Sequence, residues 1–312
     1  MTRPTVLVYH GDPKYAELVR VPRNRAVVRA AATPSEAAEL IADTEILYAW
    51  KFPPHLFAKA ARLKWLQAMG AGVDWAITRE LSPRVVVTRA PGIFGPWMAE
   101  YVIGWCSWVT QRIETYREAQ RQRRWLDHVL PDRLHGKTLT IVGLGDIGRA
   151  IARAARTFGM RVVGVNRSGR RVREAERVFK VGQLAQALAD ADFVVVLVPL
   201  TPETRGLIGA DALAAMKPTA WLVNIARGAV VNEAALFEAL EQRRLAGAIL
   251  DVFSAEPLPP NHPLWRMDNV VITPHVSGPS TPEEIAPVFN DNLARYLAGS
   301  PLRHVVDRAR GY

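Results

Sequence analysis

A glycine-rich turn at residues 143–148 constrains the fold of this chain more than any other sequence feature. The segment Gly143-Leu-Gly-Asp-Ile-Gly148 follows a short apolar run at 138–142 and precedes a helical pattern at 147–158. In a strand–turn–helix unit, the first glycine permits the tight turn, the second lets the backbone approach a pyrophosphate, and the third allows close helix–strand packing. The positive end of the helix dipole attracts the phosphates. The pattern therefore predicts a dinucleotide site, whose contacts would come from Gly143, Leu144, Gly145, Asp146, Ile147 and Gly148.

Short apolar runs alternate with helical patterns along the whole chain, which is typical of parallel sheets covered by helices. From residue 137 onward, strands are predicted at 138–142, 161–166, 193–198, 221–225, 247–251 and 270–273. Before residue 90, strands are predicted at 5–9, 46–49, 65–68 and 85–87, with helices at 35–42 and 54–61. We therefore expect an α/β chain, with a Rossmann-type doubly wound parallel sheet inserted in a smaller flavodoxin-like α/β domain. The smaller domain would comprise residues 1–96 and 286–312, and the dinucleotide-binding domain residues 97–285.

The end of the second predicted strand of the larger domain bears on which dinucleotide binds. An acidic residue there would bind the ribose 2′-hydroxyl and repel a 2′-phosphate. This chain instead reads Asn166-Arg-Ser-Gly-Arg-Arg171. Amide, hydroxyl and guanidinium groups can hydrogen-bond to a phosphate, so we expect NADPH to be preferred and NADH to remain possible. The residues expected to contact it are Asn166, Arg167, Ser168 and Arg171. The alternative is that these arginines are simply solvated.

Three ionisable residues, Arg227, Glu256 and His275, follow later apolar strands. The carboxyl ends of parallel strands are where ligands bind in such sheets. Arginine can bind a carboxylate through two hydrogen bonds, and histidine can exchange a proton near neutral pH, with its ring oriented by a neighbouring carboxylate. Together the three predict a catalytic site. Taken alone, His275 could equally be a structural histidine.

Charge and cysteine content indicate which partners and which cellular compartment the protein has. The chain has 40 Lys plus Arg against 30 Asp plus Glu, a net charge of +10. These basic residues are spread along the sequence, which favours a solvated surface over a nucleic-acid site. The single cysteine, Cys106, suits a reducing compartment, and no apolar run is long enough for a membrane span. We expect a cytoplasmic protein without a metal site, and without nucleic-acid or membrane partners.

Several spaced motifs together resemble the D-isomer-specific 2-hydroxyacid dehydrogenase family over essentially the whole chain. They are the glycine turn, Thr201-Pro-Glu-Thr204, Asn224-Ile-Ala-Arg-Gly228, Leu250-Asp-Val-Phe-Ser-Ala-Glu-Pro257 and Pro274-His-Val-Ser277. A narrower set is most similar to the glyoxylate/hydroxypyruvate reductase A type of that family. It comprises Gly70-Ala-Gly-Val-Asp74, Pro263-Leu-Trp265 and Val306-Asp-Arg-Ala-Arg-Gly-Tyr312.

The resemblance implies hydride transfer from a nicotinamide to a small 2-keto acid such as glyoxylate or hydroxypyruvate, giving an (R)-2-hydroxy acid. His275 would donate the proton, Glu256 would hold His275, and Arg227 would bind the substrate carboxylate. The implied substrate contacts are Trp50 (which could equally be a core residue), Gly70, Ala71, Gly72, Arg227 and His275. The further cofactor contacts are Leu197, Val198, Pro199, Thr204, Ile225, Ala226, Arg227, Asp251, His275 and Ser277. The resemblance also implies a homodimer built on a helix at 97–121, and closure of the domains on substrate.

Two alternatives to a glyoxylate/hydroxypyruvate reductase remain. One is a different NAD(P)-linked member of the family, acting for example on D-lactate, phosphoglycerate or phosphite. The other is a non-catalytic protein that binds a dinucleotide as a signal. Enzymatic turnover would distinguish the second from an enzyme, whereas retention of Arg227, Glu256 and His275 would not.

Overall fold

The computed structural model describes residues 3–21 and 25–311 of the chain. These divide into two compact units, one formed by the described residues up to Phe94 and from Ser280 onward and the other by Gly95–Pro279. The boundaries expected from the sequence, after residues 96 and 285, lie a few residues beyond these crossings. Tyr312, the last residue of the motif at 306–312, lies outside the described residues.

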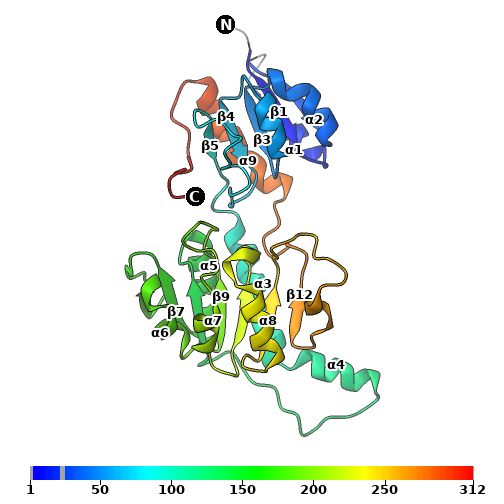
Figure 1. The fold of residues 1–312 in the computed structure, drawn as a ribbon, viewed down its shortest axis with the longest axis vertical. Helices are drawn as coiled ribbons and strands as arrows, with labels where there is room; N and C mark the ends of the chain where they lie inside the picture. Colours follow the sequence, from blue (N-terminus) through cyan, green and yellow to red (C-terminus); the bar gives the residue numbers. More distant parts are fainter. Residues whose placement is uncertain (1–2, 22–24, 312) are drawn as a thin grey trace. The chain divides into compact units, whose positions relative to one another are not determined.

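The first unit contains a parallel five-stranded sheet (Figure 1). Its strands are β1 (Thr5–Tyr9), β2 (Val27–Ala31), β3 (Ile46–Ala49), β4 (Trp65–Ala68) and β5 (Val86–Thr88), in the order β2-β1-β3-β4-β5. That order is the flavodoxin-like one. Every residue of β3 and β4 is buried, as expected for apolar runs covered on both faces. The sequence prediction missed β2, because this edge strand buries one side chain and carries a mixed pattern.

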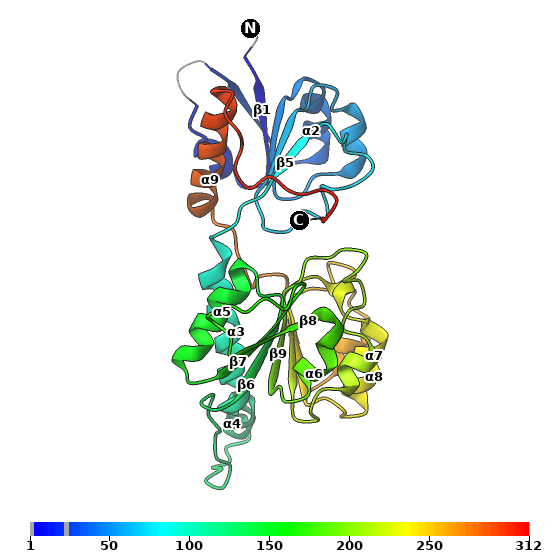
Figure 2. The ribbon, with the colours of Figure 1, turned by 90° about the vertical axis from the view of Figure 1, so that its left-hand side faces the viewer.

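Helices cover both faces of this sheet. They are α1 (Lys14–Glu17), α2 (Pro34–Leu40) and α9 (Pro282–Leu297), with 3₁₀ turns at Ile41–Asp43 and Pro54–Lys59. Figure 2 shows α2 and α9 on opposite sides of the strands. The Thr33 hydroxyl caps α2 by accepting from the Glu36 backbone N–H. The helix predicted at 54–61 is present as a 3₁₀ helix at Pro54–Lys59, two residues shorter than expected.

A buried polar network fastens the returning C-terminal segment to the first unit. Asn292 of α9 donates to Gln67 of β4 at 3.1 Å, and Gln67 accepts from Thr88 of β5 at 2.7 Å. The tail then pairs with β5, where the Val306 N–H donates to the Val87 carbonyl. Residues far apart in the sequence thus complete one core.

The second unit contains a parallel seven-stranded sheet. Its strands are β6 (Thr138–Val142), β7 (Arg161–Asn166), β8 (Arg177–Lys180), β9 (Phe193–Val196), β10 (Trp221–Asn224), β11 (Gly247–Leu250) and β12 (Val270–Ile272). The order β12-β11-β10-β9-β6-β7-β8 makes it a doubly wound Rossmann-type sheet whose strand order reverses between β6 and β9. The sequence prediction of six strands omitted β8, an edge strand with no buried residue and an exposed charged residue at each end.

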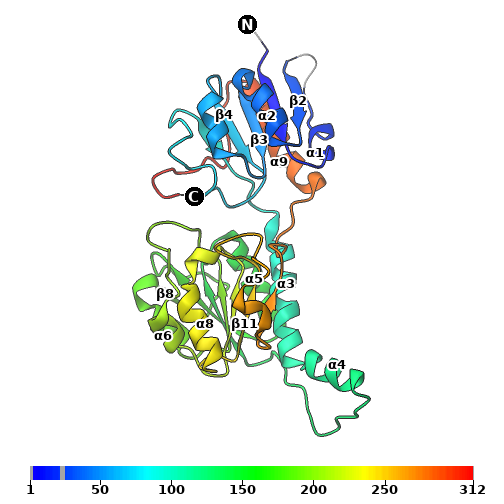
Figure 3. The ribbon, with the colours of Figure 1, turned by 45° about the vertical axis from the view of Figure 1, so that its right-hand side comes forward.

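Helices also cover both faces of this second sheet. They are α3 (Phe94–Thr110), α5 (Asp146–Thr157), α6 (Leu184–Leu188), α7 (Ala210–Ala214) and α8 (Glu233–Glu241), while α4 (Ile113–Arg121) follows α3. Figure 2 shows α3 and α5 on one face and α6, α7 and α8 on the other. The continuous helix predicted at 97–121 was wrong: Arg112 adopts a left-handed conformation (φ 52°) and separates α3 from α4. Figure 3 shows α4 extending past the end of α3, away from the sheet. In the described parts of the chain, no helix combines the length and apolar character needed to cross a membrane.

Candidate functional site

Asp251 is the central acceptor at the carboxyl ends of β11 and β12. Its carboxylate is fully buried and accepts three hydrogen bonds, from the Thr273 hydroxyl at 2.5 Å, the Val276 N–H at 2.8 Å and the Ser277 N–H at 2.9 Å. The Asp251 carbonyl in turn accepts from the His275 N–H at 2.8 Å. One carboxylate therefore shapes the turn that carries His275.

His275 and Glu256 form a pair on this turn. The His275 Nδ1 lies 2.9 Å from Glu256 Oε2, and about a quarter of each side chain is exposed. The other Glu256 oxygen accepts from the Phe253 N–H at 3.1 Å, which fixes the carboxylate. His275 has a φ of 56°, a left-handed conformation that is uncommon for a residue with a side chain. With Nδ1 facing a carboxylate, Nε2 is the ring nitrogen left to serve a ligand.

The loop after β10 presents Arg227. The buried Asn224 amide holds this loop by donating to the Arg227 carbonyl at 3.2 Å and accepting from the Ala226 N–H at 3.2 Å. A Cβ at Gly228 would lie 2.0 Å from the Phe253 carbonyl carbon, so the β10 and β11 loops can meet only at a glycine. Arg227 and the Glu256 segment are therefore supported by one contact between loops.

The glycine turn after β6 has the geometry expected of a dinucleotide site. Gly143 has a φ of 117° and packs against the backbone of Leu197 and Val198, at the point where the strand order reverses. A Cβ at Gly148 would lie 2.2 Å from the Gly143 oxygen, whereas one at Gly145 would meet nothing within 4 Å. Gly145 also caps α5 without any side-chain hydrogen bond. A ligand can therefore approach the helix N-terminus closely at Gly145, and these residues fit a pyrophosphate.

Other predicted cofactor residues form the walls and turns around this point. The Leu144 side chain is buried against Gly164 of β7, which leaves its backbone for a ligand. Ile225 and Ala226 are buried, and the Thr204 hydroxyl is taken up locally, donating to the Pro199 carbonyl at 2.6 Å and accepting from the Thr201 N–H at 2.8 Å. Thr204 thus shapes the 199–204 loop.

Asn166 organises the loop that follows β7. Its amide oxygen accepts from the Gly169 N–H at 2.6 Å, and its amide nitrogen donates to the Arg170 carbonyl at 3.0 Å. Arg167, Ser168 and Arg171 are exposed on this loop. Asn166 therefore acts first as a turn former, and the exposed side chains are the ones presented to a ligand.

In the first unit, Trp50 and the glycine loop 70–72 lie together at the carboxyl ends of β3 and β4. A Cβ at Gly70 would lie 3.1 Å from the Trp50 ring, so the indole packs directly on this backbone. Trp50, Ala71 and Gly72 are partly exposed, whereas Gly70 is buried.

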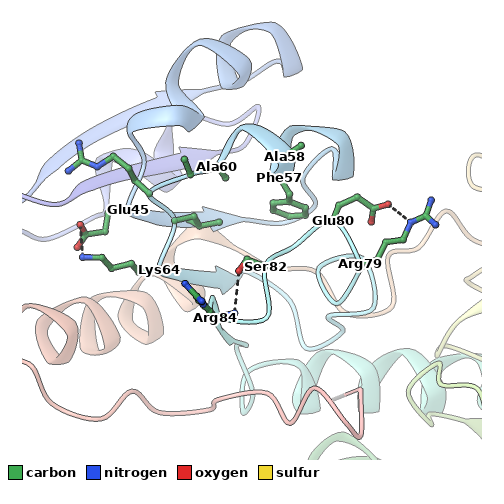
Figure 4. Close-up of a pocket in the computed structure, with 12 residues that line it drawn as sticks. Glu45, Phe57, Ala58, Ala60, Lys64, Arg79, Glu80, Ser82 and Arg84 are labelled. Atoms are coloured by element: carbon green, nitrogen blue, oxygen red, sulfur yellow. Dashed lines mark hydrogen bonds and ion pairs between the residues drawn. The ribbon is translucent and has the colours of Figure 1, made fainter.

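A separate surface pocket of about 680 Å³ lies on the first unit and contains none of the predicted site residues (Figure 4). Four of its charged residues form two pairs, with Lys64 3.2 Å from Glu45 and Arg79 3.0 Å from Glu80. Among the described residues, no group of three His, Cys, Asp or Glu side chains is placed to hold a metal ion.

Sequence reasoning missed the residues that support the site from behind. Tyr101 of α3 places its hydroxyl 2.7 Å from the Thr273 hydroxyl, which donates to Asp251. Thr273 and Asn224 could have been found, because they adjoin Pro274-His275 and Ala226-Arg227. Tyr101 could not, because it lies 172 residues from Thr273 and no spacing rule links them.

Fold and site together define a dinucleotide-dependent oxidoreductase with a histidine–carboxylate pair. Residues 104–277 match the family described as D-isomer specific 2-hydroxyacid dehydrogenase, NAD binding domain. The chain belongs to this family of NAD(P)-dependent oxidoreductases, as the resemblance implied.

Relatives and solved structures agree with this assignment. The chain is 34% identical to a glyoxylate/hydroxypyruvate reductase A of Serratia proteamaculans over 272 residues, which is 84% of this chain and 86% of that protein. A D-isomer specific 2-hydroxyacid dehydrogenase family protein from Aeromonas salmonicida superposes with a TM-score of 0.90 at 38% identity, covering 98% of this chain and all of that one. The NADPH-dependent glyoxylate/hydroxypyruvate reductase of Sinorhizobium meliloti, solved with NADP and sulfate, gives 0.89 at 30% identity with both chains fully covered.

Proposed function

We propose that this chain is an NADPH-preferring reductase that converts small 2-keto acids, glyoxylate and hydroxypyruvate, to (R)-2-hydroxy acids. The observation that carries the proposal is the 2.9 Å contact between His275 Nδ1 and Glu256. It orients the imidazole and leaves Nε2 to donate a proton.

Each residue has a defined task in this reaction. When bound, the reduced nicotinamide supplies the hydride that adds to the keto carbon. His275 Nε2 donates its proton to the keto oxygen, so that the C=O bond becomes CH–OH. Arg227 binds the substrate carboxylate, and its persistent charge stabilises the developing oxyanion. Glu256 keeps the imidazole in place before transfer.

The preference for NADPH is supported by the loop after β7. No carboxylate stands at the end of this strand to repel a 2′-phosphate, and Arg167, Ser168 and Arg171 are exposed there. Relatives support the same choice, since the Sinorhizobium meliloti enzyme is described as NADPH-dependent. The glyoxylate and hydroxypyruvate names of relatives at 30–34% identity support the substrate class.

We also propose that the chain forms a homodimer through the α4 extension. Trp125 and Leu130, in the segment after α4, are 91% and 73% exposed. Large apolar side chains exposed to this degree on a protruding segment favour burial against a second copy.

The test is a turnover assay on the purified protein. Glyoxylate, hydroxypyruvate and larger 2-keto acids are each mixed with NADPH or NADH, and loss of the reduced-nicotinamide absorbance is followed. The proposal predicts rapid oxidation of NADPH with glyoxylate or hydroxypyruvate and slower oxidation of NADH. Equal rates with both cofactors would remove the cofactor preference. No turnover with any 2-keto acid, despite tight dinucleotide binding, would favour a sensing protein.

A further inference from the structure

The loop that joins β7 to β8 contains a buried glutamate. Glu174 is 1% exposed, and its Oε1 is surrounded by three guanidinium groups. The contacts are 3.1 Å to Arg149 Nη2, 3.2 Å to Arg153 Nη1 and 3.4 Å to Arg173 Nε. The Arg149 hydrogen bond contributes most to lowering the pKa of Glu174 to about 2, so the carboxylate is charged at neutral pH. A buried charge with three opposite partners is expensive to disturb.

These arginines join two elements that both face the cofactor. Arg149 and Arg153 lie one turn apart on α5, whose N-terminus is the proposed pyrophosphate site. Glu174 and Arg173 belong to the loop that carries Arg167, Ser168 and Arg171. Arg156 of α5 adds a further link by donating to the Arg173 carbonyl at 2.9 Å. The clamp of Glu174 with Arg149, Arg153 and Arg173 therefore ties the loop to α5.

The loop is held at both of its ends. At the start, Asn166 forms the turn through Gly169 and Arg170. At the end, the Glu176 N–H donates to the Val162 carbonyl at 2.8 Å, and Glu174 enters the clamp. Residues 167–171 lie between the two anchors. Without a negative charge at position 174, the arginines of loop and helix would repel one another and the loop would move away from α5.

We infer that Glu174 is a positioning residue for cofactor choice. It fixes the distance between the α5 N-terminus and the exposed side chains of residues 167–171. This inference rests on the proposed function, because it assumes that α5 binds the pyrophosphate and the loop binds the 2′-phosphate. NADPH would contact α5 through its pyrophosphate and the loop through its 2′-phosphate at the same time. NADH lacks the 2′-phosphate and would depend mainly on the contact with α5. Disturbing the clamp should therefore weaken NADPH binding selectively.

The experiment compares Glu174→Gln with the matched control Glu176→Gln. Glu176 is exposed, lies in the same loop, and appears in none of the ion pairs found among the described residues. Dissociation constants for NADPH and NADH are measured by calorimetry, without substrate. We expect Glu174→Gln to weaken NADPH binding by about tenfold, in the range of coupled charge networks, and NADH binding by about twofold or less. Glu176→Gln should match the wild type or bind NADPH slightly more tightly.

Two further measurements separate positioning from general damage. Hydrogen exchange of residues 167–173 should accelerate in Glu174→Gln and not in Glu176→Gln. Arg153→Ala should reproduce the selective loss, and the double variant should lose less than the two single losses combined. Equal losses for NADPH and NADH, or unchanged NADPH binding, would overturn the inference. If the wild type itself does not prefer NADPH, the proposed cofactor preference fails, and the inference about Glu174 must be judged by hydrogen exchange alone. Unchanged hydrogen exchange of residues 167–173 in Glu174→Gln would then show that the clamp does not hold the loop.

Discussion

At the scale of single residues, the site depends on groups that hold other groups. Asp251 accepts hydrogen bonds from three donors and thereby sets the backbone of the turn bearing His275, including its left-handed φ of 56°. Such conformations persist only where the surroundings enforce them. His275 and Glu256 could be proposed from the sequence because ionisable side chains after apolar strands are conspicuous. The role of Asp251 as a hub depends on hydrogen bonds that no sequence pattern displays.

The glycine turn allows a matched pair of substitutions. A methyl group at Gly148 would clash with the Gly143 oxygen at 2.2 Å, whereas one at Gly145 would enter open space. We expect Gly148→Ala to lower the free energy of unfolding by about 1–3 kcal/mol or more, as in overpacked cores. Gly145→Ala should change it by about 0.5 kcal/mol or less while weakening NADPH binding. Denaturant unfolding and calorimetry measure the two effects. A Gly145→Ala protein that binds NADPH like the wild type would contradict the assigned pyrophosphate contact.

At the scale of elements, the sequence best predicted those strands whose side chains are buried. Central strands such as β3, β9 and β10 consist mostly of buried apolar residues, and the sequence located each to within two residues. The edge strands β2 and β8 were missed, because their exposed faces mix charged and apolar side chains. The break between α3 and α4 was missed for a different reason. An arginine can adopt the left-handed conformation, but nothing in its sequence context marks it.

The extension formed by α4 and the following segment leads to a prediction about self-association. Trp125→Glu should shift the protein from dimer to monomer in sedimentation velocity, because the substitution places a charge where apolar contact is expected. Phe158→Glu is the control, since Phe158 is also apolar and 50% exposed but follows α5. A wild-type protein that sediments as a monomer would refute the proposed dimer, as would a Trp125→Glu protein that remains dimeric.

At the scale of the whole molecule, two parallel sheets of different strand order make up the chain. The fold class was predictable because one glycine motif and a regular strand–helix alternation are both strong constraints, and the structures of relatives confirm it. Arg227, Glu256 and His275 could be selected because each follows a strand of the same parallel sheet, whose carboxyl ends share one edge. Tyr101 of α3 could not be selected in this way, because the packing of a helix against that edge depends on tertiary contacts.

The central claim is that His275 donates the proton in 2-keto acid reduction, and one substitution with a matched control tests it. His262 forms a similar pair, with its Nε2 3.1 Å from Glu233, and takes no part in the proposed reaction. Turnover with saturating glyoxylate and NADPH is measured for His275→Gln and His262→Gln. The account predicts that His275→Gln loses about 10²–10⁴ in kcat, the usual contribution of a general acid, while His262→Gln retains the wild-type value. A kcat for His275→Gln within about threefold of wild type, far below that contribution, would contradict the account.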